Sequence, residues 1–123
     1  MSCKLKYHHI GIPTAKELPQ KDYVPQYKLY ASGYDDSPYG VEWMNFDPDC
    51  PLPDLVKTVP HVAFVVTDIK EAIKGKDVLI APNSPTEGVT AAFIVDNGAP
   101  VEFLQFERPE NEIWSRNAKF KDR

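Results

Sequence analysis

Two histidines and two glutamates recur at matching places in this chain, and both residue types bind metal ions. Residues 41–46 (VEWMNF) match residues 101–106 (VEFLQF) position by position as valine, glutamate, aromatic, aliphatic, carboxamide and phenylalanine. Upstream of each copy, residues 9–12 (HIGI) and 61–64 (HVAF) share the order histidine, branched apolar, small, large apolar. A repeat of this kind indicates two related structural modules, each with one histidine strand and one glutamate strand.

The position of each glutamate predicts a carboxylate that is shielded from water. In an alternating strand, Glu42 and Glu102 each share a face with an aliphatic residue two positions on and a phenylalanine four positions on. A carboxylate in such surroundings must be paired, hydrogen-bonded or bound to a metal ion. On the same reasoning, each histidine shares its face with a small residue, Gly11 or Ala63, which leaves room beside the imidazole.

The four repeated residues together form a candidate metal site. The proposed ligands are His9, Glu42, His61 and Glu102. Two imidazoles and two carboxylates suit a divalent transition metal ion, such as zinc, nickel, manganese, cobalt or iron, with open positions for water or substrate. Taken singly, each residue has a more ordinary interpretation, since a strand histidine is typically a core or rim residue and a strand glutamate usually faces solvent. Their recurrence in equivalent positions favours the metal site.

His8 stands apart from this set. It has no counterpart in the second module, where Pro60 holds the equivalent place. Strand alternation over residues 5–12 also puts it on the face opposite His9. We therefore interpret His8 as a structural residue.

The composition excludes several classes of function. The 123 residues include 14 Lys+Arg and 18 Asp+Glu, for a net charge of -4, and no basic run occurs. Nucleic acid and acidic membrane surfaces are therefore poor candidates for partners. No apolar run approaches the roughly 20 residues of a membrane helix, and the N-terminus lacks the apolar core of a signal peptide, so we expect a cytoplasmic protein. Cys3 and Cys50 are expected to be free thiols.

Sequence patterns predict a β-α-β-β-β order in the second half of the chain. Asp68 and Glu71 form a capping box at the start of a short amphipathic helix, and Gly75 stands where a left-handed C-cap belongs. The strands of this half are predicted at residues 61–67, 77–81, 89–95 and 100–106, with a loop at 82–88 and a tight turn at 96–98.

The first half repeats this plan in a reduced form. Its strands are predicted at residues 5–12, 27–32 and 39–46, the last two forming a hairpin, with room for one further indistinct strand. Pro19 and Pro25 leave space for at most one turn of helix, at residues 15–18.

The chain is therefore predicted to be a single domain, residues 1–123, with an α+β fold. The first module covers about residues 4–47 and the second about 60–107. Between them, the proline-rich residues 48–59 are predicted to be a rigid linker. Residues 108–123 form a charged tail.

The tail offers few apolar contacts. Its large apolar residues are Ile113, Trp114 and Phe120. They could belong to a short docking helix or a strap at an interface, or the tail could be exposed and partly ordered.

Three motifs of this chain resemble the vicinal oxygen chelate superfamily, which includes glyoxalase I, bleomycin-resistance proteins, methylmalonyl-CoA epimerase and extradiol dioxygenases. They are residues 9–12, residues 61–64 with the helix after Asp68, and residues 101–104. The resemblance covers nearly the whole chain to Phe106. It implies two βαβββ modules whose strands form a curled mixed sheet around a metal cleft, often in a homodimer. The stunted helix of the first module departs from this pattern.

The resemblance also implies roles for the four repeated residues. The ligand positions of the superfamily fall on His9, Glu42, His61 and Glu102, and the carboxylate at position 42 makes the set similar to that of glyoxalase I. The arginines of this chain are confined to the tail, at Arg108, Arg116 and Arg123. The basic contacts that glyoxalase I makes to glutathione are therefore not evident, which argues against glutathione as the substrate.

The leading hypothesis is a metal-dependent lyase or isomerase of the glyoxalase type. It would act on a small oxygenated substrate that chelates the metal, through an enediolate or enolate. His9 and His61 would be permanent ligands, and Glu42 or Glu102 would serve as general base. Side chains proposed to line the cleft are Tyr30, Trp43, Met44, Phe93 and Phe106.

Two alternatives stay open at this point. One is a non-catalytic protein of the bleomycin-resistance kind, which binds a small molecule in the cleft without a metal. The other is an extradiol-type dioxygenase, in which His9, His61 and Glu102 hold iron and Glu42 is a bystander.

Overall fold

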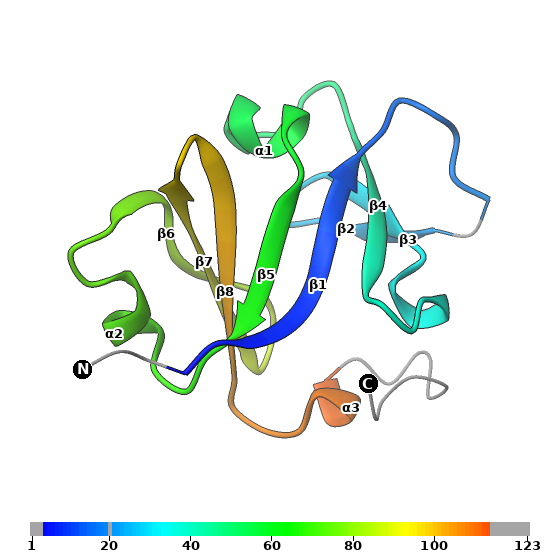
Figure 1. The fold of residues 1–123 in the computed structure, drawn as a ribbon. Coiled ribbons are helices and arrows are strands. Elements are labelled where there is room, and N and C mark those ends of the chain that lie inside the picture. The colour runs from blue at the N-terminus through cyan, green and yellow to red at the C-terminus, as the bar shows by residue number, and fades with distance from the viewer. Residues whose placement is uncertain (1–3, 20, 114–123) are drawn as a thin grey trace.

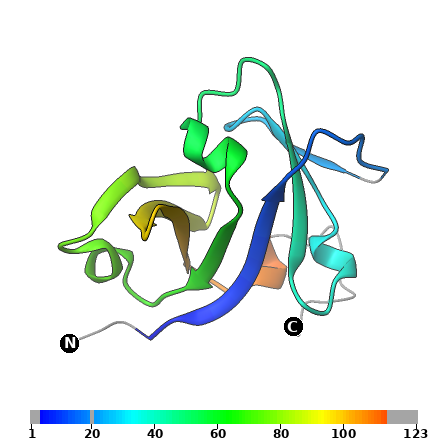
Figure 2. The same ribbon diagram turned by 45° about the horizontal axis from the view of Figure 1, so that its top comes forward.

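One curled, eight-stranded sheet organises the protein, with short helices at its margins (Figures 1 and 2). The structure, a computed structural model, describes residues 4–19 and 21–113. The elements follow in the order β1 (Lys6–Pro13), β2 (Asp22–Val24), β3 (Leu29–Ser32), the 3-10 helix η1 (Tyr34–Asp36), β4 (Val41–Phe46), α1 (Asp54–Thr58), β5 (His61–Val65), α2 (Ile69–Ile73), β6 (Asp77–Thr86), β7 (Val89–Asp96), β8 (Ala99–Phe106) and α3 (Glu110–Ile113).

The strand order reveals the two modules. Across the sheet the order is β2-β3-β4-β1-β5-β8-β7-β6. β1 pairs in parallel with β4, and β5 pairs in parallel with β8, so each histidine strand lies beside its own glutamate strand. β1 and β5 then meet as an antiparallel pair at the centre of the sheet. The predicted α+β fold with two related modules and a curled mixed sheet is confirmed.

The second module has the predicted helix. The Asp68 side chain accepts hydrogen bonds from the backbone amides of Lys70 and Glu71, and Gly75 has the predicted left-handed conformation, with φ +74°. α2 packs its apolar side onto the outer face of this module, where it forms a core cluster. The buried members of that cluster are Val66, Ile69, Ala72, Ala92, Ile94 and Phe103.

The first module is reduced further than the sequence indicated. Residues 15–18, where one turn of helix was allowed, contain no helix. The indistinct strand is β2, which is only three residues long and pairs with β3 at the sheet edge. Among the described residues, the first module therefore has no equivalent of α2 on its outer face.

The structure adds a helix within the predicted linker, and the prediction of a loop was wrong for residues 82–86. The stretch 48–59, interpreted as a linker, contains α1, whose Val56 is 1% exposed and which contacts β1 and β8. A helix of five residues is too short to show a periodic pattern and is held by tertiary burial. β6 continues through the predicted loop as far as Thr86. β6 lies at the edge of the sheet, where one side of the strand makes no backbone hydrogen bonds to a neighbouring strand. Pro82 and Pro85, which have no amide proton, are therefore tolerated there.

The turn before β8 is as predicted. Asp96 pairs with Ala99, and the two residues between them, Asn97 and Gly98, have φ values of 51° and 79°. Positive φ at both central positions is the requirement of a type I′ hairpin turn.

The remaining expectations concern the termini, the thiols and the membrane. Cys50 is a free, buried thiol, whereas Cys3 lies outside the described residues. α3 begins the tail and includes Ile113, while Trp114 and Phe120 fall outside the described part. No helix within residues 4–19 and 21–113 has the length and apolar character of a membrane span.

The cap of α2 can be tested directly. We expect Asp68→Ala to destabilise the protein by about 1 kcal/mol, because the amides of Lys70 and Glu71 lose their acceptor. Urea unfolding measures the change, and Asp68→Asn is the matched control because asparagine also caps helices well. Equal losses in the two variants would contradict this role for the side chain.

Candidate metal centre

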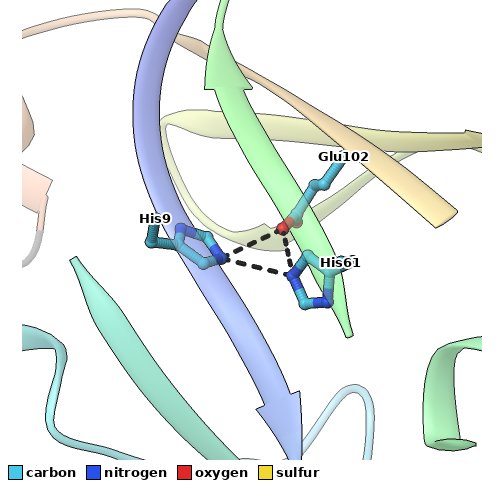
Figure 3. A group of neighbouring side chains, drawn as sticks. All are labelled: His9, His61 and Glu102. Atoms are coloured by element: carbon cyan, nitrogen blue, oxygen red, sulfur yellow. Dashed lines mark hydrogen bonds and ion pairs between the residues drawn. The ribbon is translucent and has the colours of Figure 1, made fainter. Parts of the chain in front are cut away.

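Three strands bring His9, His61 and Glu102 together on the inner face of the sheet. His9 comes from β1, His61 from β5 and Glu102 from β8, and their side chains converge as Figure 3 shows. The two Nε2 atoms lie 3.3 Å apart. Glu102 Oε1 is 3.1 Å from His61 Nε2 and 3.4 Å from His9 Nε2. All three residues are buried, with exposed fractions of 7% or less.

The strand register explains why these side chains meet. In the antiparallel pair β1 and β5, His9 lies opposite Ala63 and His61 lies opposite Gly11. In the parallel pair β5 and β8, Ala63 lies opposite Glu102. Each histidine thus faces a small residue of the other module's histidine strand. The small residue of the repeated motif therefore leaves space for the imidazole on the facing strand.

Gly11 is the tightest point of this arrangement. A Cβ atom at position 11 would collide with the His61 ring, at 2.8 Å from both Nδ1 and Nε2. The room that the sequence indicated is therefore filled by the imidazole of the partner strand. His61 also packs edge-on against Phe93, with ring centroids 5.2 Å apart.

A β-bulge places His8 beside His9. The register shifts by one residue between Tyr7 and His9, so strand alternation is broken at His8. Both histidines are consequently 7% exposed, and their Nδ1 atoms lie 2.7 Å apart. The predicted position of His8 on the opposite face was wrong, because simple alternation cannot anticipate a bulge.

The charged groups of the cluster shift the pKa values of His9 and Glu102 in directions that favour their charged forms. Burial alone would lower the pKa of His9, but the carboxylates of Glu42, Glu102 and Glu110 outweigh it and raise this pKa above 6.5. Burial alone would raise the pKa of Glu102, but hydrogen bonds and charge from His61 and His9 lower it to about 2. The Glu102 carboxylate is therefore ionised at neutral pH.

Glu42 lies at the edge of the cluster. Its Oε1 atom is 3.6 Å from His9 Nε2, and its side chain is 17% exposed, compared with 10% for Glu102. β4 carries it at the position opposite Gly11, as β8 carries Glu102 opposite Ala63. Glu42 does not belong to the group of His9, His61 and Glu102, whose ligand atoms all lie within 4.8 Å of one another.

The three-residue group could hold a divalent transition metal ion. Ligand atoms bound to one ion at roughly 2.0–2.2 Å lie about 3 to 3.5 Å from each other, depending on the coordination geometry. The separations of 3.1, 3.3 and 3.4 Å among the donor atoms agree with that spacing. His61 Nδ1 is buried without a hydrogen-bond partner among the described residues, so on that side of the ring only packing orients the imidazole.

A cleft of about 210 Å³ opens onto the cluster. Met44 and Phe93 line it, as predicted, together with Tyr27 and Tyr34. The prediction was wrong for Tyr30, Trp43 and Phe106, which do not belong to the described lining of the cleft. Trp43 follows Glu42 on an alternating strand and is 43% exposed, so the parity that brings Glu42 inward turns Trp43 away.

The structure also identifies residues near the cluster that sequence reasoning missed. Tyr34 and Glu110 both contact His8, and Glu110 comes from the stretch interpreted as a tail. Neither belongs to the repeat, so the sequence carried no signal that could have placed them at the site.

Comparison with known proteins shows the fold alone. The protein is similar to the crystal structure of a hypothetical protein from Bacillus halodurans C-125, with a TM-score of 0.62 and 17% sequence identity over 85% of this chain and 96% of the other. The curled half-barrel sheet is compatible with a vicinal oxygen chelate fold. No family model and no curated protein matches the sequence.

Gly11 provides a test of the cluster geometry. We expect Gly11→Ala to weaken zinc binding roughly 10- to 100-fold, because the added methyl group displaces the His61 ring. Competition with a chromophoric chelator measures the dissociation constant. Ile12→Ala on the same strand is the control and should reduce stability without changing zinc affinity. A wild-type dissociation constant in Gly11→Ala would contradict the proposed close approach.

The lowered pKa of Glu102 predicts an acid-sensitive stability in the metal-free protein. Since the folded-state pKa is about 2 and the ordinary value is 4.5, the stabilisation is present above pH 4.5 and is lost as the pH falls toward 2. Its size is on the order of 3 kcal/mol, at about 1.4 kcal/mol per pKa unit.

The free energy of unfolding in urea, measured with a chelator present to keep the protein metal-free, gives this loss when values above pH 4.5 are compared with values between pH 4.5 and 2. Wild type and Glu87→Gln, an exposed control, should show it. Glu102→Gln should show a smaller loss. Parallel losses in all three proteins would contradict the assignment.

Proposed function

We propose that the protein is a metal-dependent lyase or isomerase of the glyoxalase type, within the vicinal oxygen chelate superfamily. The observation that carries this proposal is the buried group of His9, His61 and Glu102 at the cleft, with a second carboxylate, Glu42, at its edge. The fold similarity is compatible with it, and the sequence motifs favour it.

The three buried residues would hold the ion. A divalent cation bound by His9, His61 and Glu102 would act as a Lewis acid that stabilises negative charge on the oxygens of a substrate. Burial of the donor atoms keeps water from competing for them, and the ionised Glu102 supplies compensating charge.

Glu42 is the better candidate for the general base. Glu102 is held by two histidines, at 3.1 and 3.4 Å, whereas Glu42 has a single longer contact with His9 and is more exposed. Glu42 would take a proton from the carbon next to the substrate carbonyl, and the electron pair of that bond would form the carbon–carbon double bond of an enediolate or enolate. The protonated Glu42 would then return the proton to the former carbonyl carbon of an enediolate, while the remaining hydroxyl proton passes to the other oxygen and the carbonyl group forms at the first carbon. In an enolate, the proton would return to the carbon that lost it.

The cleft favours a small, uncharged substrate. Its volume of about 210 Å³ is below the range typical of sites for drug-sized ligands. Its described lining contains three carboxylates, those of Asp22, Glu42 and Glu102, and no lysine or arginine. An anionic substrate would meet repulsion there, so a neutral α-hydroxycarbonyl compound fits better than a glutathione adduct.

A second candidate function has one specific observation in its favour. Two histidines and one carboxylate are the ligand type of many non-haem iron oxygenases, and Glu42 lies outside the compact group of three. In an extradiol-type dioxygenase, Glu42 would not be required as a base.

Exchange of a carbon-bound hydrogen with solvent separates these functions. The protein would be loaded in turn with zinc, nickel, manganese, cobalt or ferrous iron and mixed with dihydroxyacetone in D₂O. We expect wild type to incorporate deuterium next to the carbonyl, as followed by NMR. Glu42→Gln should retain its metal and lose exchange by roughly 100-fold or more, because a general base typically contributes that much.

The controls separate binding from catalysis. His61→Ala should lose the metal, and Asp22→Asn, another carboxylate of the cleft, should keep both the metal and the exchange. Undiminished exchange in metal-loaded Glu42→Gln would overturn the assignment of the base. Oxygen uptake by the ferrous protein with catechol, without exchange in any metal form, would favour the dioxygenase.

A further inference from the structure

A chain of hydrogen bonds links the C-terminal helix α3 to the candidate metal centre. After β8 the backbone turns below the sheet, and α3 lies near the beginning of β1 (Figure 1). Glu110 Oε2 is 2.9 Å from His8 Nε2. On the other side of the same ring, His8 Nδ1 is 2.7 Å from His9 Nδ1. Glu110 thus reaches His9 through a single imidazole.

Proton accounting fixes the direction of these hydrogen bonds. Tyr34 donates its only hydroxyl proton to Glu110 Oε2, at 2.9 Å, and its oxygen also lies 2.8 Å from His8 Nε2. Both neighbours of His8 Nε2 are therefore acceptors, so this nitrogen must carry a proton. A neutral His8 then has a lone pair on Nδ1.

The same accounting continues to His9. In the neutral form of His8, Nδ1 accepts, and the 2.7 Å contact then has His9 Nδ1 as its donor. A histidine protonated on Nδ1 presents the lone pair of Nε2 for coordination. In His9 that atom faces His61 Nε2 and Glu102 Oε1, at 3.3 and 3.4 Å.

We propose that Glu110 is a positioning residue that sets the tautomer of His8 and, through His8, makes His9 Nε2 a metal ligand. The proposal deepens the metal site on which the proposed function rests, and it does not depend on the reaction. Residues that hydrogen-bond a metal-coordinating histidine orient its ring and so affect the affinity for the metal. Here that task falls on a carboxylate supplied by the tail.

Ring packing holds the relay in place. The His8 ring stacks on Tyr34, with centroids 4.9 Å apart and an angle of 19° between the planes. His9 meets His8 edge-on, at 5.0 Å and 74°. His61, in contrast, has no hydrogen-bond partner for Nδ1 within the described chain. The two histidine ligands are therefore oriented in different ways, His9 by hydrogen bonds and His61 by packing.

The imidazole tautomers provide the first test, since the chain contains only three histidines. Long-range ¹H–¹⁵N NMR spectra of tag-free protein distinguish a proton on Nδ1 from a proton on Nε2. In the metal-free and the zinc-loaded protein we expect His8 to be protonated on Nε2, and in the zinc-loaded protein we expect His9 to be protonated on Nδ1. A proton on Nδ1 of His8 in the wild-type protein would overturn the proposal.

A matched pair of variants in α3 provides the second test. Glu110→Ala should give a mixture of His8 tautomers and raise the zinc dissociation constant roughly 10- to 100-fold. Glu112→Ala removes an exposed carboxylate from the same helix and should leave both readouts unchanged. Wild-type tautomers and wild-type zinc affinity in Glu110→Ala would overturn the proposal.

Substitution of His8 separates the relay from simple packing. His8→Asn keeps an acceptor near the position of Nδ1 and should retain more zinc affinity than His8→Leu, which has none. Equal affinities in these two variants would overturn the relay. Failure of the wild-type protein to bind zinc or any other tested metal would instead count against the proposed metal function, whereas the tautomer of His8 would still decide the relay.

Discussion

The convergence of three buried donor atoms is the constraint on which the rest of the structure depends. His9, His61 and Glu102 are buried, yet their nitrogen and oxygen atoms lie within 3.1 to 3.4 Å of one another. Buried polar groups are costly unless a proton or a cation compensates them. The central antiparallel pair β1 and β5 makes the convergence possible, because Gly11 leaves space for an imidazole on the facing strand.

The two modules contribute unequally to stability and to chemistry. The two hydrophobic clusters of buried residues both lie in the second module: one joins α2 and Val66 to β7 and β8, and the other joins β5 to β7 and β8. The first module has no helix on its outer face among the described residues, and its strand β2 is short. The bulge in its first strand nevertheless gives the site His8, which has no counterpart in the second module. The second module thus supplies the buried clusters together with His61 and Glu102, and the first supplies His9 and the added polar network around His8.

The asymmetry extends to how the two histidines are held. His61 is confined by Gly11 and Phe93, so its orientation depends on packing. His9 is tied through His8 to Glu110, which lies beyond the repeat. The cleft beside the two histidines is largely apolar, and the charged side chains of its described lining are acidic.

The sequence by itself determined the modular plan, the helix after Asp68, the turn at Asn97 and Gly98, and the four repeated polar residues. These features have local signals: a repeated motif, a capping box, and a residue pair that accepts positive φ. Only the tertiary structure decided that three of the four donors converge while Glu42 stays at the edge. It also decided that His8 turns inward at a bulge, that α1 forms within the supposed linker, and that Glu110 reaches the site. Each of these outcomes depends on pairing or packing between distant segments, for which a local pattern carries no information.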